Sequence, residues 1–163
     1  MNDLLTHSLL YGTVLSILSA AVLLLNAWRN PESMVDDYPP DIRAQHGPMS
    51  GEARRHKKFV SLPFGVILIG LLALSIMRLP EITFTSVFVN VAVMLALFNL
   101  VDLLLLDWLL FNTIRPRFMV LPGTEGMPGY SDYGFHFRQF LKGTAGGIIA
   151  SLFIAAVAAL LSR

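Results

Sequence analysis

Four long apolar stretches alternate with polar stretches along the chain, and this alternation predicts the fold. The apolar stretches cover about residues 4–28, 59–77, 84–111 and 144–161. Each is long enough for a helix across the hydrocarbon core of a bilayer, which needs about 20 mostly apolar residues. The pattern predicts an all-α protein, an integral membrane four-helix bundle. Its two long loops, at about residues 29–58 and 112–143, are expected to be structured.

Composition agrees with this prediction and narrows it. The chain has 163 residues, of which 55% are hydrophobic and 14% charged, whereas soluble domains have about 25% charged residues. Four spans leave no room for a separate soluble domain, so we expect one transmembrane domain over residues 1–163. The chain has no cysteine, which excludes a disulfide framework and a catalytic thiol.

The uneven distribution of basic residues predicts an orientation. All of the 12 Lys and Arg residues except Arg78 and Arg163 lie in the two loops. Short loops rich in Lys and Arg stay in the cytoplasm. We therefore predict a multi-pass protein of the cell membrane with both long loops cytoplasmic and both termini outside. The residues before the first span carry Asp3 and no basic residue, which argues against a cleaved signal peptide.

Two rows of small residues at four-residue spacing predict helix contact faces. The rows are Ser8, Gly12, Ser16 and Ala20 in the first span, and Gly143, Gly147, Ser151 and Ala155 in the fourth. Small residues let membrane helices approach closely, and close packing drives their association. The rows pair either within one bundle or between protomers, and the second alternative makes the protein a homo-oligomer.

The third span holds two carboxylates, Asp102 and Asp107. Carboxylates within a span are candidates for function because burying them is expensive. Counted from Thr83 at about 1.5 Å per residue, Asp102 lies roughly 28 Å deep, near the far boundary of the hydrocarbon core. In an α-helix the two carboxylates diverge by about 140°, which predicts that they form no pair. The alternative to a catalytic role is a structural salt bridge to Arg115, Arg117 or other loop cations.

The second loop combines turn-forming residues with aromatic and basic ones. Residues 121–129 are rich in Gly and Pro, and the aromatic stretch that follows contains His136, a third candidate for catalysis. One interpretation is a pocket for an anionic head group, because the planar guanidinium of arginine suits phosphate. Its candidate ligand-binding residues are Arg115, Arg117, Tyr133 and Arg138. The other interpretation is a folded interfacial loop that closes the bundle.

The first loop contains acidic residues followed by a basic cluster. Two prolines lie between the Asp36–Asp37 pair and Asp41. They interrupt the helix that would have to hold all three carboxylates around a shared magnesium ion. One of these prolines is expected to start a short helix. Ser50 is expected to cap the start of a helix that runs through residues 52–58 into the second span. The basic cluster, expected to attract anionic lipid head groups at about 1 kcal/mol per residue, is Arg54, Arg55, Lys57 and Lys58.

No resident metal or cofactor is predicted. The four histidines are far apart in the sequence, none is in the interior of a span, and no zinc-ligand spacing occurs. No glycine-rich nucleotide loop occurs either. Membrane lipids are the expected partners, and nucleic acid is not.

Three classes of function fit these observations. We prefer a small binding or accessory protein whose cytoplasmic loops engage anionic lipid head groups or a partner protein. Second is a membrane-embedded enzyme acting on a phosphate-bearing amphiphile, which requires the loop arginines and the span carboxylates to converge on one cavity. Third is an oligomeric transporter or channel, which requires a continuous polar cavity across the bilayer. This ranking favours a protein without enzymatic activity.

Overall fold

The computed structural model describes residues 2–162 and contains four long helices. They are α1 (Asn2–Arg29), α3 (Gly51–Met77), α4 (Phe84–Val101) with its continuation η2 (Asp102–Ile114), and α5 (Tyr133–Leu161). The loops contain four short helices, η1 (Pro31–Asp37), α2 (Pro40–His46), η3 (Arg117–Met119) and η4 (Pro128–Ser131). All four long helices are long and apolar enough to cross a membrane. The predicted all-α bundle is confirmed.

Two helices begin earlier than the predicted spans because polar residues cap them. α3 begins at Gly51, where Ser50 Oγ accepts a hydrogen bond from Ala53 N at 3.2 Å, as the cap prediction requires. α5 begins at Tyr133, well before 144, since Asp132 Oδ1 accepts from Phe135 N at 2.8 Å. The second loop is therefore shorter than predicted, and its aromatic stretch belongs mostly to α5.

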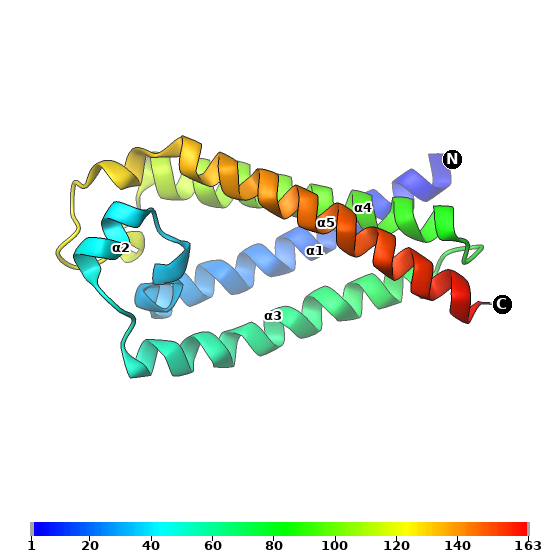
Figure 1. Ribbon diagram of the computed structural model, residues 1–163, viewed down its shortest axis with the longest axis horizontal. Helices are drawn as coiled ribbons and strands as arrows, with labels where there is room; N and C mark the ends of the chain where they lie inside the picture. Colours follow the sequence, from blue (N-terminus) through cyan, green and yellow to red (C-terminus); the bar gives the residue numbers. More distant parts are fainter. Residues whose placement is uncertain (1, 163) are drawn as a thin grey trace.

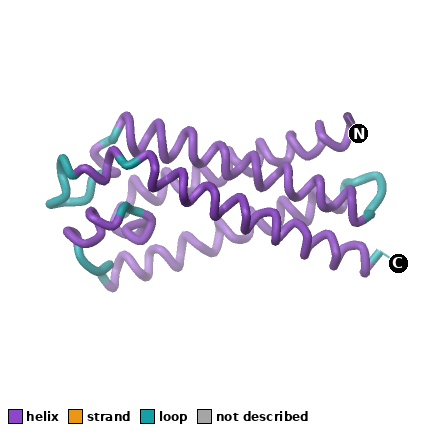
Figure 2. Tube along the Cα trace, turned by 45° about the horizontal axis from the view of Figure 1, so that its top comes forward, coloured by secondary structure: helices purple, strands orange, loops and turns teal. Residues whose placement is uncertain are grey.

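α4 is the central helix of the bundle. It packs along α1 on one side and α5 on the other, whereas α3 packs mainly against α1. The N- and C-terminal ends of the described chain lie at one end of the bundle, with the turn between α3 and α4 (Figure 1). The long loops gather at the opposite end (Figure 2). We call these the terminal end and the loop end.

Both rows of small residues contact α4 within the chain. A Cβ added at Gly12 of α1 would meet Met94 Cα and Leu97 Cδ2 at 3.2 Å, and one at Gly143 of α5 would meet Asn99 Oδ1 at 2.7 Å. Ser151 and Ala155 continue the α5 face and are fully buried. The rows thus hold α1 and α5 against one central helix, while the homo-oligomer through the same rows stays a prediction.

The terminal half of the bundle is closed by packing and by a polar network. Leu15, Val87, Val91 and Met94 are fully buried there. Asn90 of α4 accepts from Ser8 Oγ at 3.0 Å and donates through Nδ2 to Ser75 Oγ at 2.8 Å, which joins α1, α4 and α3. Buried polar groups need such partners because leaving them unpaired is costly.

A separate small core closes the loop end; we call η1, α2, η3 and η4 with their links the loop cap. Its buried residues are Val35, Tyr38, Ile42, Met49, Ala53, Phe111, Leu121 and Tyr130. The Tyr38 hydroxyl donates to Met119 O at 2.9 Å, and Asp41 Oδ2 accepts from Gly129 N at 2.8 Å. These bonds connect the first loop to the second, so both predicted loops are folded.

We expect Gly143→Ala to destabilise the bundle, because the added methyl group meets the Asn99 amide that bonds to Phe140 O and Thr144 Oγ1. Overpacking of this kind costs about 1–3 kcal/mol. Gly146→Ala on the same helix meets nothing within 4 Å and is the matched control. Thermal unfolding in detergent should show a lower Tm for Gly143→Ala only; equal Tm values for the two variants would contradict the close packing.

Candidate functional site

A cavity of about 460 Å³ lies at the loop end of the bundle, beneath the loop cap. This volume is within the range of small-molecule sites, about 300–1,000 Å³. Its polar lining consists of Asp36, Asp37, Tyr38, Asp102, Asp107, His136 and Gln139. Its apolar lining consists of Leu23, Leu24, Ala27, Met34, Phe64, Phe98, Leu106, Phe111 and Met119. All four long helices and η1 contribute to it.

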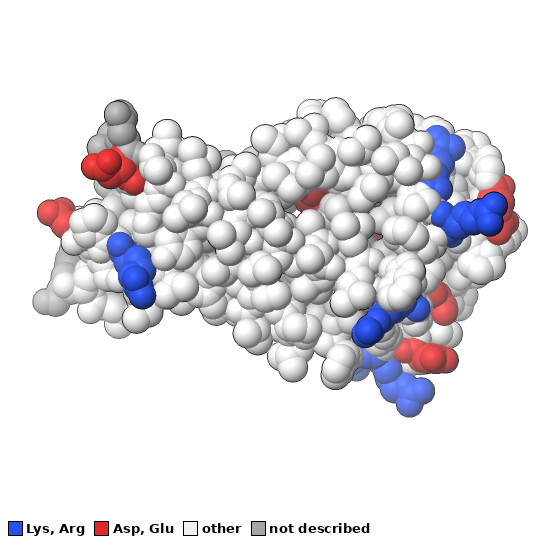
Figure 3. Space-filling view, turned by 180° about the vertical axis from the view of Figure 1, so that it is seen from behind, with Lys and Arg blue, Asp and Glu red and all other residues white. Residues whose placement is uncertain are grey.

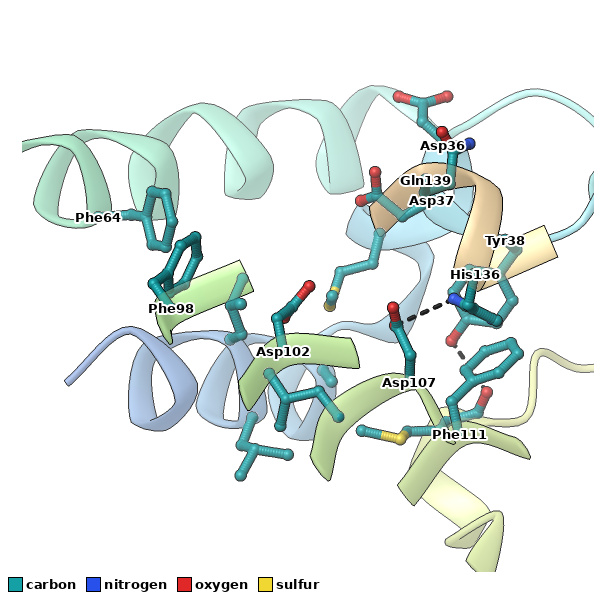
Figure 4. A pocket seen from close by; sticks show the side chains of 16 residues that line it. Asp36, Asp37, Tyr38, Phe64, Phe98, Asp102, Asp107, Phe111, His136 and Gln139 are labelled. Carbon is teal, nitrogen blue, oxygen red and sulfur yellow. Dashed lines mark hydrogen bonds and ion pairs between the residues drawn. The ribbon is translucent and has the colours of Figure 1, made fainter. Parts of the chain in front are cut away.

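The third span brings both of its carboxylates to this cavity by changing its helical register. From Asp102 to Ile114 the backbone is a π-helix, in which each N–H bonds to the carbonyl five residues earlier. Residues five apart therefore lie nearly above one another, and Asp102 and Asp107 project to the same side (Figure 4). The predicted 140° divergence is wrong, because it assumed α-helical rotation.

The Asp107 carboxylate contacts the imidazole of a buried histidine. His136 Nδ1 lies 3.0 Å from Asp107 Oδ1, and the histidine is 5% exposed. The Phe111 ring packs edge-on against the imidazole at 4.9 Å. Among the described residues, Nε2 of this imidazole has no hydrogen-bond partner. A carboxylate at one ring nitrogen fixes the orientation of the imidazole and leaves the other nitrogen for a ligand or a proton.

The salt bridge predicted between the span carboxylates and arginine does not form. Asp107 pairs with His136 instead. The side chain of Asp102 has neither a hydrogen bond nor an ion pair with any residue between 2 and 162. Its carboxylate lines the cavity, so it is one of the groups that a bound ligand would meet.

Two adjacent acidic residues of η1 complete the polar lining, and sequence reasoning missed both. Lys57 Nζ donates to Asp36 Oδ2 at 2.8 Å, and this hydrogen bond lowers the pKa of Asp36. Asp37 is open to the cavity and has no such partner in the described chain. The surrounding protein still shields it from bulk water, and this burial raises the pKa of Asp37 despite the attraction of Lys57. The only signal in the sequence was an Asp–Asp pair without an adjacent cation.

The candidate ligand-binding residues lie outside this cavity. Arg115 and Arg117 line a second pocket of about 420 Å³ with Glu125 and Tyr130. The backbone of Arg115 has a left-handed conformation, with φ 50°, at the end of η2. Its guanidinium donates to Ser131 Oγ at 2.6 Å. The sequence had no signal that would separate these arginines from the carboxylates.

Tyr133 and Arg138 are also directed elsewhere. The Tyr133 hydroxyl bonds to Thr113 Oγ1 at 2.8 Å, and Arg138 lies 3.7 Å from Asp132 with a largely exposed side chain. The enzyme interpretation requires the carboxylates and the arginines to line one cavity. Asp102, Asp107 and His136 line it, and the arginines do not.

The basic cluster lies in the first turns of α3 at the loop end. Arg54, Arg55 and Lys58 are exposed, while Lys57 is held by Asp36. Seen from behind, basic and acidic side chains gather at the two ends of the molecule, and acidic atoms also show in a recess of the uncharged middle (Figure 3). In the described part of the chain, no three His, Asp or Glu side chains are grouped closely enough to hold a metal ion.

Fold and site together define a four-helix bundle of membrane-spanning type with an acidic cavity at its loop end. No protein-family model, no curated protein and no solved structure matches the chain. Function is therefore inferred from the geometry of the site.

We expect Asp37→Asn to raise Tm at pH 7. The folded-state pKa of Asp37 is raised above its ordinary value of 3.8, so its negative charge disfavours the folded state at neutral pH. That cost is absent below the unfolded-state pKa and grows as pH rises through the folded-state pKa. The gain in Tm should therefore shrink as pH falls to 4.

Asp36→Asn is the matched control at the neighbouring position. The pKa of Asp36 is lowered by Lys57, and exposed ion pairs contribute about 0–1 kcal/mol. This variant should show an unchanged or slightly lower Tm at pH 7. A higher Tm for Asp36→Asn, or a lower Tm for Asp37→Asn at all pH values, would contradict the surroundings described for these two carboxylates.

Proposed function

We propose that this chain is a small membrane-embedded binding protein whose cavity receives the positively charged group of a ligand. The observation that carries the proposal is that four carboxylates line one cavity and that none of the Lys and Arg residues between 2 and 162 lines it. The proposal keeps the binding class preferred from the sequence and moves the site from the loop arginines to the carboxylates at the cavity.

The pairing of the acidic side chains supports two of them as the groups that a ligand would contact. Asp36 is paired with Lys57, and Asp107 with His136. Asp37 and Asp102 remain without partners among residues 2–162. Unpaired carboxylates in a partly desolvated site are costly, and a bound cation with N–H donors offsets that cost through charge-assisted hydrogen bonds.

The same charges argue against a phosphate ligand in this cavity. Phosphate would meet four carboxylates, while the guanidinium groups suited to it line the other pocket. Like charges disfavour one another strongly at low dielectric. We therefore do not assign the phosphate-bearing amphiphile to this site.

Orientation and lipid contact are further parts of the proposal. We place the loop end in the cytoplasm on the strength of its Lys and Arg content. The exposed residues Arg54, Arg55 and Lys58 then face the head groups of anionic lipids, which attract each basic residue by about 1 kcal/mol. In this orientation the cavity opens near the cytoplasmic leaflet.

A second candidate function is catalysis, and one observation favours it. Asp107 orients the buried imidazole of His136, whose Nε2 has no partner in the described chain. A histidine held in this way can act as a general base. Transport receives no comparable support, because tightly packed side chains fill the terminal half of the bundle.

The test uses three probes of equal chain length that differ only in charge: octylamine, octanol and octanoate. Binding to protein in phosphatidylcholine nanodiscs is measured by calorimetry and by the rise in Tm, since a ligand that binds only the folded state stabilises it. We expect saturable binding of octylamine, and binding of octanol and octanoate at least about tenfold weaker, as expected for the loss of a charged hydrogen bond.

Two variants and one control assign the effect to the cavity. Asp102→Asn and Asp37→Asn should each weaken octylamine binding by about tenfold. Glu81→Gln, an exposed acidic residue at the terminal end, should leave it unchanged. Binding of octanoate as tight as that of octylamine, or unchanged octylamine binding in both Asp variants, would refute the proposal.

A further inference from the structure

We propose that the ligand is a membrane amphiphile whose apolar tail lies against Phe64 and Phe98 and which enters the cavity sideways, between α3 and α5, from the surrounding leaflet. This inference rests on the proposed function, because the carboxylates must receive the cationic head. It adds the chemical class of the ligand and the route by which it reaches the site.

The lining of the cavity is polarised along the bundle axis. Asp36 and Asp37 of η1 lie toward the loop end, and Phe64 and Phe98, whose rings are tilted against each other, lie at the opposite side of the cavity (Figure 4). The two phenylalanine rings are 6.2 Å apart, and Leu23 and Leu24 of α1 add further apolar surface. A ligand with one charged end and one apolar end matches this arrangement.

The loop cap covers the loop end of the cavity, although the Asp36 side chain there is 64% exposed. The loop cap has its own buried core, in which Tyr38 is 4% exposed and Tyr130 is 2% exposed. Tyr38 is bonded to Met119, and Asp41 to Gly129. Glu32 of η1 also accepts from Ser50 Oγ at 2.9 Å at the start of α3. Entry through the cap would break this core and these bonds.

The helices on the other sides are packed together, except for one pair. α4 packs along α1 and α5, and α1 packs against α3. In the described chain α3 and α5 do not form an extensive contact, although Phe64 of α3 and Gln139 of α5 both line the cavity.

The gap between α3 and α5 lies between two helices that are both long and apolar enough to cross a membrane, so it opens toward lipid. The outer face of α3, turned away from Phe64, is apolar too: Phe59, Leu62 and Val66 are 79%, 71% and 63% exposed, as expected for a span that contacts acyl chains. A ligand that passes between α3 and α5 must therefore already be in the bilayer. A water-soluble cation would have no apolar part to contact Phe64 and Phe98.

The experiment holds the charge of the probe constant and varies its tail. Binding of butylamine, octylamine and dodecylamine is measured in the same phosphatidylcholine nanodiscs for the unmodified protein, Phe64→Ala and Phe64→Leu. The control is Phe59→Ala, because Phe59 is on the same helix but turned about 140° away from Phe64 and does not line the cavity. Partitioning of each amine into lipid is the same for all variants and cancels in their ratios.

We expect Phe64→Ala to weaken dodecylamine binding about fivefold and butylamine binding less than about twofold, since only the long tail reaches the phenylalanine. Phe64→Leu should restore most of the loss, and Phe59→Ala should change neither amine. Retained butylamine binding also shows that Phe64→Ala is folded. Equal effects of Phe64→Ala on both amines, or no effect on either, would overturn the proposed tail site.

The variant Asp102→Asn separates this inference from the proposed function. If it weakens both amines while Phe64→Ala weakens neither, the cation site stands and the tail site is wrong. If the unmodified protein binds neither amine, or if Asp102→Asn affects neither, the proposed function fails and the tail site fails with it.

Discussion

The site depends on one change in backbone hydrogen bonding, from the α to the π pattern at Asp102. The two carboxylates of the third span are five residues apart, a spacing that shares a face in a π-helix and not in an α-helix. The same register directs Phe111 into the loop cap and places Trp108 against Tyr133 of α5, with ring centroids 5.9 Å apart. π-Helical segments are rare and concentrate at functional sites, which agrees with the position of the cavity along this segment.

Stability and ligand binding depend on different halves of the bundle. Close packing of α1 and α5 on α4, through glycine, serine and alanine, holds the terminal half together. At the loop end the helices diverge, and the folded loops cover the space between them (Figure 1). Two of the acidic residues in this space do not stabilise the fold, since Asp37 has a raised pKa and the Asp102 side chain has no partner within residues 2–162. Natural proteins keep such costly groups mainly where function requires them.

The fold could be predicted from the sequence because its determinants are local or periodic. Apolar length predicted the four helices, and Ser50 predicted the start of α3. Asp102 and Asp107 could be identified as candidates for function because carboxylates are rare inside spans. The site could not be predicted as a whole, for two physical reasons. No residue type marks a π-helix, so the shared face of the two carboxylates was hidden. Asp37 reaches the cavity only through the tertiary folding of η1 within the loop cap, which the sequence pattern does not record.

The most direct test of the central claim measures whether residues 102 and 107 share a face. The chain has no cysteine, so pairs of thiols can be introduced and their bridging by Cd²⁺ followed from the thiolate–metal absorption band. Asp102→Cys with Asp107→Cys should bridge in the π register, whereas Asp102→Cys with Leu105→Cys, three residues apart, should bridge only in an α-helix. Tight Cd²⁺ binding by the first pair alone is the predicted result. Tight binding by the second pair alone would show an α-helix there, with the two carboxylates on different faces and no acidic cavity of the kind described.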